Sequence, residues 1–161
     1  MTPHDFLKNA LEPALLLLPQ KMSTNPARAM VIAICLQESQ LKDRKQIGGP
    51  ARSYAQFEKG GGVVGVLNHY ASRQHARIVL SRLDYSEDSG PDACFIAIEH
   101  NDILCAAFSR LLLYTLPELM PVKGDPDHGW HCYQKAWRPG KPHRSTWNAN
   151  FAEAWQTVEG A

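Results

Sequence analysis

The hydrophobic and polar positions of this chain predict helices along most of its length. Apolar residues recur at intervals of three and four, and loops rich in proline, glycine and polar residues separate these stretches. The stretches that we expect to be helical are 4–18, 26–41, 63–83, 92–115, 128–137 and 147–158. The pattern predicts a mainly α fold, with at most a small strand or hairpin element near residues 50–64.

The segment 26–41 differs from the other predicted helices because it is apolar on nearly every face. A capping sequence, Ser-Thr-Asn at 23–25, precedes Pro26, and proline suits the first position of a helix. Residues 29–36 read Ala-Met-Val-Ile-Ala-Ile-Cys-Leu, so this helix should run through the middle of the core. Glu38 falls in its last turn.

Glu38 therefore places an ionisable group beside a hydrophobic wall. Burial disfavours the charged form of a carboxyl and raises its pKa, which lets a glutamate stay protonated and act as a general acid. A polar stretch at 42–49 ends in a Gly-Gly-Pro turn signal. The chain should reverse there and bring residues 51–58, including Gln56, back across the end of the helix.

Composition predicts a single domain spanning residues 1–161. The chain is 44% hydrophobic and 20% charged, which suits one globular core. A formal net charge of +1, with scattered lysines and arginines, gives no indication of a nucleic-acid partner. The apolar run at 14–18 is too short for a membrane span and lacks the features of a cleaved signal peptide. We expect the four cysteines to be reduced, because their surroundings are mostly apolar or helical; they are Cys35, Cys94, Cys105 and Cys132.

Glu38, Ser39 and Gln56 together resemble the lysozyme-like superfamily, specifically its soluble lytic transglycosylase branch. In that family a helix ends in Glu-Ser, and after a turn the segment Gly-Ala-x-Gly-Leu-Met-Gln follows. Here the corresponding segment reads Pro-Ala-Arg-Ser-Tyr-Ala-Gln, so Pro50 and Ser53 replace the two glycines. Gln56 follows Glu38 at the interval usual in the family. The segments Leu-Gln-Glu-Ser, Gly-Gly-Pro-Ala-Arg, Gln-Phe-Glu and Trp-Arg-Pro-Gly-Lys-Pro resemble phage-encoded lysozyme-like proteins of virions and prophages more than bacterial housekeeping enzymes.

The resemblance implies cleavage of the glycosidic bond between N-acetylmuramic acid and N-acetylglucosamine in peptidoglycan, with Glu38 as general acid. In lytic transglycosylases the same carboxylate then takes a proton from the muramoyl hydroxyl and gives an anhydro product. A muramidase, which hydrolyses the bond, needs a second carboxylate. Glu58 is the candidate for that second carboxylate, and Asp43 is a weaker one.

The remaining candidate residues are those that would contact the sugars. They are Ser39, Ser53, Tyr54, Gln56, Phe57, Tyr133 and Trp137. Sugar clefts combine flat aromatic faces with a few placed polar groups, and the Gln56 amide suits an N-acetyl group or the catalytic acid. Several of these residues have a structural alternative. Gln56 would bond to the turn backbone, Ser39 would end the helix, and at least one of the helically spaced aromatics at 130, 133 and 137 would pack in the core.

A second group of residues has side chains that often bind metals. His128, His131 and Cys132 lie close together, and with His143 they would suggest a zinc enzyme that cleaves peptide cross-links. Their spacing fits no zinc motif. We therefore expect no metal and no other cofactor.

The expected partner is the peptidoglycan glycan strand. A phage or prophage protein of this kind would be made in the cytoplasm of the bacterial host, without a cleaved signal peptide, and would act at the periplasmic cell wall, free or as a virion component. The alternative is a virion structural or assembly protein that has a lysozyme-like fold, little or no catalysis, and other virion proteins as partners. Pro50 and Ser53 favour that alternative, because side chains in place of glycine can narrow a cleft.

Overall fold

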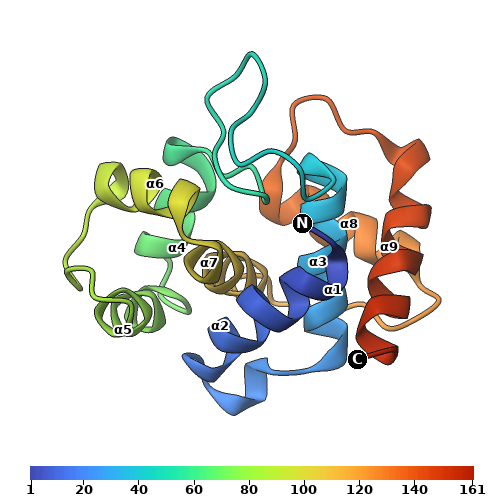
Figure 1. Cartoon of the computed structure of the whole chain (residues 1–161), viewed down its shortest axis with the longest axis horizontal. Helices are drawn as coiled ribbons and strands as arrows, with labels where there is room; N and C mark the ends of the chain where they lie inside the picture. Colours follow the sequence, from blue (N-terminus) through green and yellow to red (C-terminus); the bar gives the residue numbers. More distant parts are fainter.

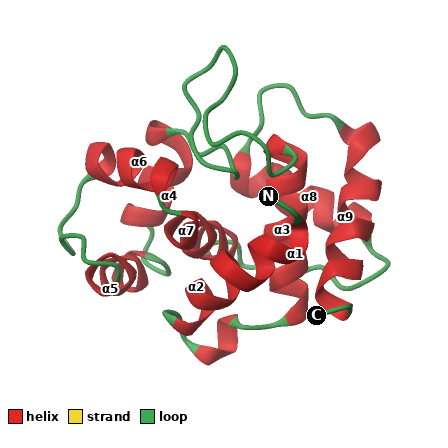
Figure 2. Cartoon of the chain, in the orientation of Figure 1, coloured by secondary structure: helices red, strands yellow, loops and turns green.

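The computed structural model describes residues 1–161 and is built almost entirely of helices and loops (Figures 1 and 2). The α-helices are α1 (Pro3–Phe6), α2 (Glu12–Leu16), α3 (Asn25–Ser39), α4 (Val64–Asn68), α5 (Arg73–Arg82), α6 (Pro91–His100), α7 (Asp102–Tyr114), α8 (Pro126–Trp137) and α9 (Arg144–Glu159). The prediction of a mainly α fold is confirmed. The small strand element expected near 50–64 is reduced to two isolated bridges, which join Lys45 to Arg52 and Arg52 to Phe57.

Helix α3 is the central helix of the half of the molecule that contains α1, α8 and α9. The Thr24 hydroxyl caps it by accepting a hydrogen bond from the Ala27 amide at 3.3 Å. Its residues from Ala29 to Leu36 are buried, and it packs along α9 (Figure 1). Because side chains surround it on nearly every face, an apolar sequence is required all the way round. It ends where Gln40 adopts a left-handed conformation with φ of 54°.

Helix α7 is the central helix of the other half, where it packs against α2, α5 and α6. Residues 92–115 were expected to form one helix, but the chain breaks at Asn101. Asn101 has extended backbone angles, and its side-chain oxygen accepts a hydrogen bond from the Leu104 amide at 3.0 Å. An asparagine cap therefore starts a new helix within a stretch whose apolar pattern runs on without interruption.

The prediction of a single helix at 63–83 is also wrong at one point. Helices α4 and α5 are separated at residues 69–72, where His69 is extended. The Ser72 hydroxyl, which is fully buried, donates to the Val66 carbonyl at 2.7 Å and holds this corner together. At the N-terminus, by contrast, Pro13 does not end the helical segment, because a π-helical turn at Leu7–Leu11 leads into α2.

One hydrophobic core of 42 buried residues joins the two halves. All four cysteines are free and buried within it. No helix combines the length and the apolar character needed to cross a membrane. Two long loops, one after α3 and one between α8 and α9, extend from the same side of the molecule (Figure 1). A cleft with many polar residues is lined by both of these loops.

Candidate active site

The cleft has a volume of about 480 Å³ and is built from segments far apart in the sequence. Its lining comes from the end of α3, from residues 46–62, from Leu112 of α7, and from residues 133–143. Glu38 is one of the lining residues. The structure thus brings the returning loop across the end of α3, as the turn signal at 48–50 predicts.

Glu38 is held by a hydrogen bond from the Tyr133 hydroxyl, which donates to the Glu38 Oε1 atom. The Tyr133 ring is only 3% exposed and stacks on Trp147 of α9, with ring centres 5.2 Å apart and planes inclined by 11°. Because packing fixes the ring, the hydroxyl fixes the Glu38 carboxyl in one position.

Burial raises the pKa of Glu38 from an ordinary value of 4.5 to about 7. The hydrogen bond from Tyr133 acts in the opposite direction, since it stabilises the carboxylate, but it is weaker than the desolvation effect. The negative charge of Glu58 also contributes to this rise, and the value of about 7 is the net result of the three effects. The same surroundings raise the pKa of Tyr133 well above its usual range, so the phenol remains a neutral donor.

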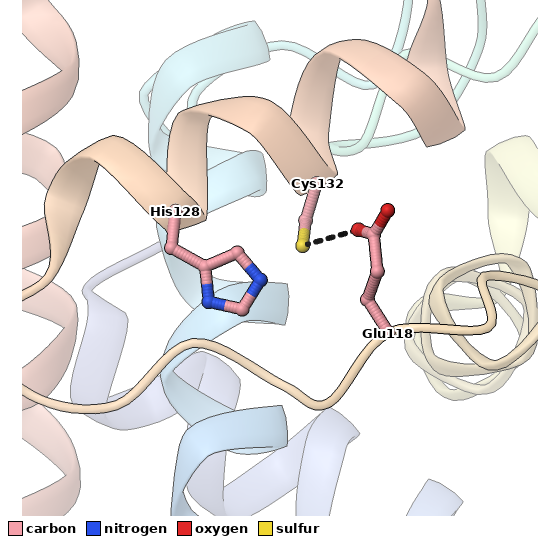
Figure 3. Close-up of side chains that lie close together, drawn as sticks. All are labelled: Glu118, His128 and Cys132. Carbon is pink, nitrogen blue, oxygen red and sulfur yellow. Dashed lines mark hydrogen bonds between the residues drawn. The ribbon is translucent and has the colours of Figure 1, made fainter.

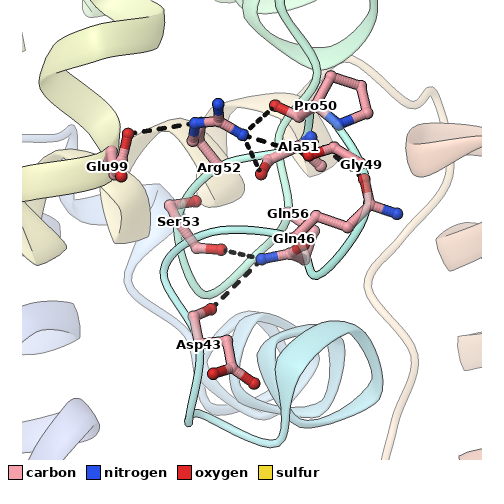
Figure 4. A network of polar contacts seen from close by, with 9 residues as sticks. All are labelled: Asp43, Gln46, Gly49, Pro50, Ala51, Arg52, Ser53, Gln56 and Glu99. Atoms are coloured by element: carbon pink, nitrogen blue, oxygen red, sulfur yellow. Dashed lines mark hydrogen bonds and ion pairs between the residues drawn. The ribbon is translucent and has the colours of Figure 1, made fainter.

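Gln56 lies in the cleft, but its amide nitrogen serves the loop. Nε2 donates to the Ser53 carbonyl at 2.7 Å and to the Asp43 carbonyl at 3.3 Å (Figure 4). With φ of 51°, Gln56 itself has left-handed backbone. The Gln56 nitrogen therefore bonds to the turn backbone, which was the structural alternative for this residue. Because Gln56 lines the cleft, its side-chain oxygen is the group that can contact a ligand.

Ser39, Ser53 and Tyr54 do not line the cleft, contrary to the role predicted for them. The Ser39 hydroxyl donates to the Cys35 and Tyr54 carbonyls, at 3.1 and 2.7 Å, and so joins α3 to the returning loop. Ser53 is fully buried. Tyr54 is 3% exposed, and its ring packs edge-on against Phe6 in the core. These three side chains build the loop rather than the surface that faces a ligand.

The two remaining aromatic candidates do line the cleft. Phe57 is 1% exposed and packs against Phe108 and Trp137, so its ring belongs mainly to the core. Trp137 is partly exposed, and its indole nitrogen donates to the Ala55 carbonyl at 2.8 Å. This bond fixes the indole beside the returning loop, which makes Trp137 the best placed aromatic face for a sugar ring.

The two carboxylates proposed as companions of Glu38 differ in position. Glu58 lines the cleft, is exposed, and has no hydrogen-bond or ion-pair partner for its side chain. Asp43 is also exposed but lies outside the lining, and only its backbone carbonyl takes part in the network of Figure 4. Glu58 is thus near enough to influence Glu38 electrostatically, but nothing in the protein orients it.

A segment with basic side chains, which the sequence analysis did not assign to the cleft, forms another part of its lining. Arg138, Lys141 and His143 all line it. Arg138 has left-handed backbone, with φ of 50°, which ends α8 and turns the chain along the cleft. Gln37 anchors the segment by donating to the His143 carbonyl at 2.9 Å. The proline- and glycine-rich sequence at 138–142 was the available signal, because such loops often border sites.

Comparisons find no matching family model, no matching curated protein and no matching solved structure. What the chain does must therefore be argued from the cleft itself. A partly buried carboxyl with a pKa of about 7, a neutral phenol on one of its oxygens and an open polar cleft are suited to proton transfer to a ligand.

Replacing Tyr133 with Phe should raise the pKa of Glu38 above 7, because the carboxylate loses the donor that stabilises it. A hydrogen bond to a charged group contributes about 1.5–3 kcal/mol, which corresponds to about one to two pH units. The shift can be followed by NMR titration of the Glu38 carboxyl carbon in wild type and variant. An unchanged or lower pKa would contradict the assigned role of Tyr133.

Proposed function

We propose that this protein cleaves the glycan strand of peptidoglycan between N-acetylmuramic acid and N-acetylglucosamine, with Glu38 as the proton donor. The observation that carries the proposal is the partly buried Glu38 carboxyl, with a pKa of about 7, on a polar cleft of about 480 Å³. The cleft is large enough for sugar rings, and it offers Trp137 as an apolar face beside several polar groups.

Cleavage begins when the Glu38 carboxyl gives its proton to the glycosidic oxygen, while the sugar ring on the other side of the bond gains oxocarbenium character. The resulting carboxylate keeps the hydrogen bond from Tyr133, which stabilises its new charge. A group with a pKa near 7 can both lose and regain a proton at neutral pH. Glu38 is therefore suited to donate a proton and then act as a base.

A reaction that needs one carboxylate fits this cleft better than one that needs two. In a lytic transglycosylase, the Glu38 carboxylate takes a proton from the muramoyl hydroxyl, which closes the anhydro ring. A second carboxylate that acts on water or on the sugar must be held in position. Glu58 is exposed and unsupported, so we assign the lytic transglycosylase reaction rather than hydrolysis.

The two departures from the family segment leave the cleft open. Neither Pro50 nor Ser53 lines it. Ser53 has φ of 69°, a left-handed conformation that favours glycine, so the backbone at this position has the form that the family glycine would allow. Arg52 donates to the Pro50 carbonyl at 2.6 Å and forms an ion pair with Glu99 at 3.2 Å, which ties the turn to α6 (Figure 4). Because Pro50 and Ser53 lie outside the lining, the two substitutions do not favour a purely structural virion protein.

The proposal is tested by incubating the protein with purified peptidoglycan and following turbidity together with the release of soluble sugar fragments. We expect clearing with concurrent release of fragments. Binding to phage head or tail components, with no fragments from peptidoglycan, would instead support the structural virion protein. Activity that a chelator abolishes and that survives the replacement of Glu38 would indicate a zinc-dependent amidase.

Replacing Glu58 with Gln separates the two glycosidic reactions. We expect clearing activity to stay within about threefold of wild type at pH 6, because the exposed carboxylate contributes only a screened charge. A loss of about a hundredfold would indicate that Glu58 is the second carboxylate of a hydrolase. Glu153→Gln, which removes an exposed and unpaired carboxylate on α9 outside the cleft, is the matched control.

A further inference from the structure

Three side chains that commonly bind metals converge outside the cleft. Glu118 comes from the loop between α7 and α8, and His128 and Cys132 lie one turn apart on α8. Residues four apart share a helix face, so both side chains point toward the loop. Figure 3 shows the imidazole and the carboxylate on either side of the thiol. None of the three lines the cleft.

The distances within this cluster suit a tetrahedral metal ion. One ligand atom from each residue lies within 4.8 Å of the other two. The Cys132 sulfur is 3.4 Å from the Glu118 Oε2 atom. Zinc bonds of about 2.3 Å to sulfur and about 2.0 Å to oxygen or nitrogen place ligand atoms about 3.5 Å apart in a tetrahedral site. Side-chain rotations that move the ligand atoms by about 1 Å would complete the arrangement.

The chemistry of the cluster favours zinc among the common divalent metals. One thiol, one imidazole and one carboxylate combine a soft, a borderline and a hard ligand, which zinc accepts, whereas calcium and magnesium prefer sites made of oxygen ligands alone. With the thiol deprotonated, the sulfur and the carboxylate carry two negative charges; the Lys135 ammonium already pairs with the carboxylate, and a divalent cation would also offset the charge of the thiolate.

Neighbouring residues already orient Glu118 for this role. The Lys135 amine and the His131 imidazole both contact the Glu118 Oε1 atom, at 2.5 and 3.3 Å. Oε2 is left facing Cys132. Outer partners that fix a carboxylate in this way are typical of metal sites.

We propose that Glu118, His128 and Cys132 bind one Zn²⁺ ion, with water as the fourth ligand, and that the ion links the loop after α7 to helix α8. The site is independent of the proposed glycan cleavage, because it lies outside the cleft. It revises the expectation of no metal. The spacing of His128, His131 and Cys132 fits no zinc motif because the third ligand comes from the preceding loop, whereas His143 lines the cleft.

The test is titration of the chelator-treated full-length protein with Zn²⁺ in competition with a chromogenic chelator. We expect one ion per chain and a thermal unfolding midpoint that rises with zinc and returns with EDTA. With Co²⁺ in place of zinc, a thiolate-to-cobalt charge-transfer band should appear. His128→Ala, at a partly exposed position, should weaken zinc binding by more than about 100-fold. Replacing a residue that only hydrogen-bonds to a metal ligand typically weakens binding by about 10–100-fold, so a larger loss indicates a direct ligand.

Two matched variants control for the loss of a histidine or a cysteine elsewhere. His4→Ala removes an exposed histidine and Cys94→Ser a buried cysteine, and both should bind zinc like wild type. Cys132→Ser should abolish the cobalt band. If Cys132→Ser does not fold, the cobalt band of wild type and the effect of His128→Ala still decide the question. Absence of the band, or wild-type zinc affinity in His128→Ala, would overturn the proposal.

Discussion

The Glu38→Gln variant should clear purified peptidoglycan at least about a hundredfold more slowly than wild type, because a positioned general acid contributes about 10²–10⁴ to the rate. Glutamine keeps the shape of the side chain and can accept the Tyr133 hydrogen bond, but it has no proton to give to the glycosidic oxygen. The measurement is the initial rate of turbidity loss at equal concentrations of folded protein.

Glu153→Gln is the control for this experiment, since it removes one exposed carboxylate that does not line the cleft. Its rate should equal that of wild type. If wild type clears peptidoglycan and Glu38→Gln does so equally fast, Glu38 is not the proton donor, and the proposed mechanism fails even if the protein acts on cell walls.

The stability of the fold should depend on the ionisation of Glu38. Folding raises the pKa of this carboxyl from 4.5 to about 7, so the stability that its protonated form provides is fully present below about pH 4.5 and is lost as pH rises through 7. The shift corresponds to about 3 kcal/mol between about pH 4 and pH 8. Glu38→Gln lacks the titrating group and should not lose this stability. As pH rises from about 4 to 8, the free energy of unfolding of the variant minus that of wild type should therefore increase by about 3 kcal/mol.

Denaturant unfolding of both proteins at about pH 4 and pH 8 measures this difference without any substrate. Glu153→Gln, at an exposed position, should show no comparable change. A difference between wild type and Glu38→Gln that stays constant with pH would mean that Glu38 titrates as an ordinary surface carboxyl. A difference of opposite sign would mean that the protein stabilises the ionised form.

Local chemistry allowed the central part of the site to be predicted from the sequence. The all-round apolar character of 29–36 predicted a buried helix, and the turn signal at 48–50 predicted the return of the chain across its end. Both follow from neighbouring residues. Helix breaks were missed where a single polar residue changes the path of the chain, as Asn101 does by capping α7. An apolar pattern that continues through the break conceals such a cap.

The contacts that set the chemistry of Glu38 could not be predicted in the same way. Tyr133 was expected to offer a flat face to a sugar, but its ring packs on Trp147 and its hydroxyl binds Glu38, 95 residues earlier in the chain. Ser39 was expected to hydrogen-bond the substrate and Tyr54 to offer a flat face to a sugar, yet their side chains hold the loop and fill the core. Proximity in sequence does not determine which side chains face a cleft.

Mass analysis of peptidoglycan digested by the wild-type protein, with Glu38→Gln in parallel, tests the central claim most directly. The account predicts soluble disaccharide-peptide fragments that end in anhydro-muramic acid, formed by wild type and not by the variant. Reducing ends would keep Glu38 as the acid but assign hydrolysis, and with it a role for Glu58. No fragments from wild type, or the same fragments from Glu38→Gln, would contradict the claim that this protein cleaves the glycan strand through Glu38.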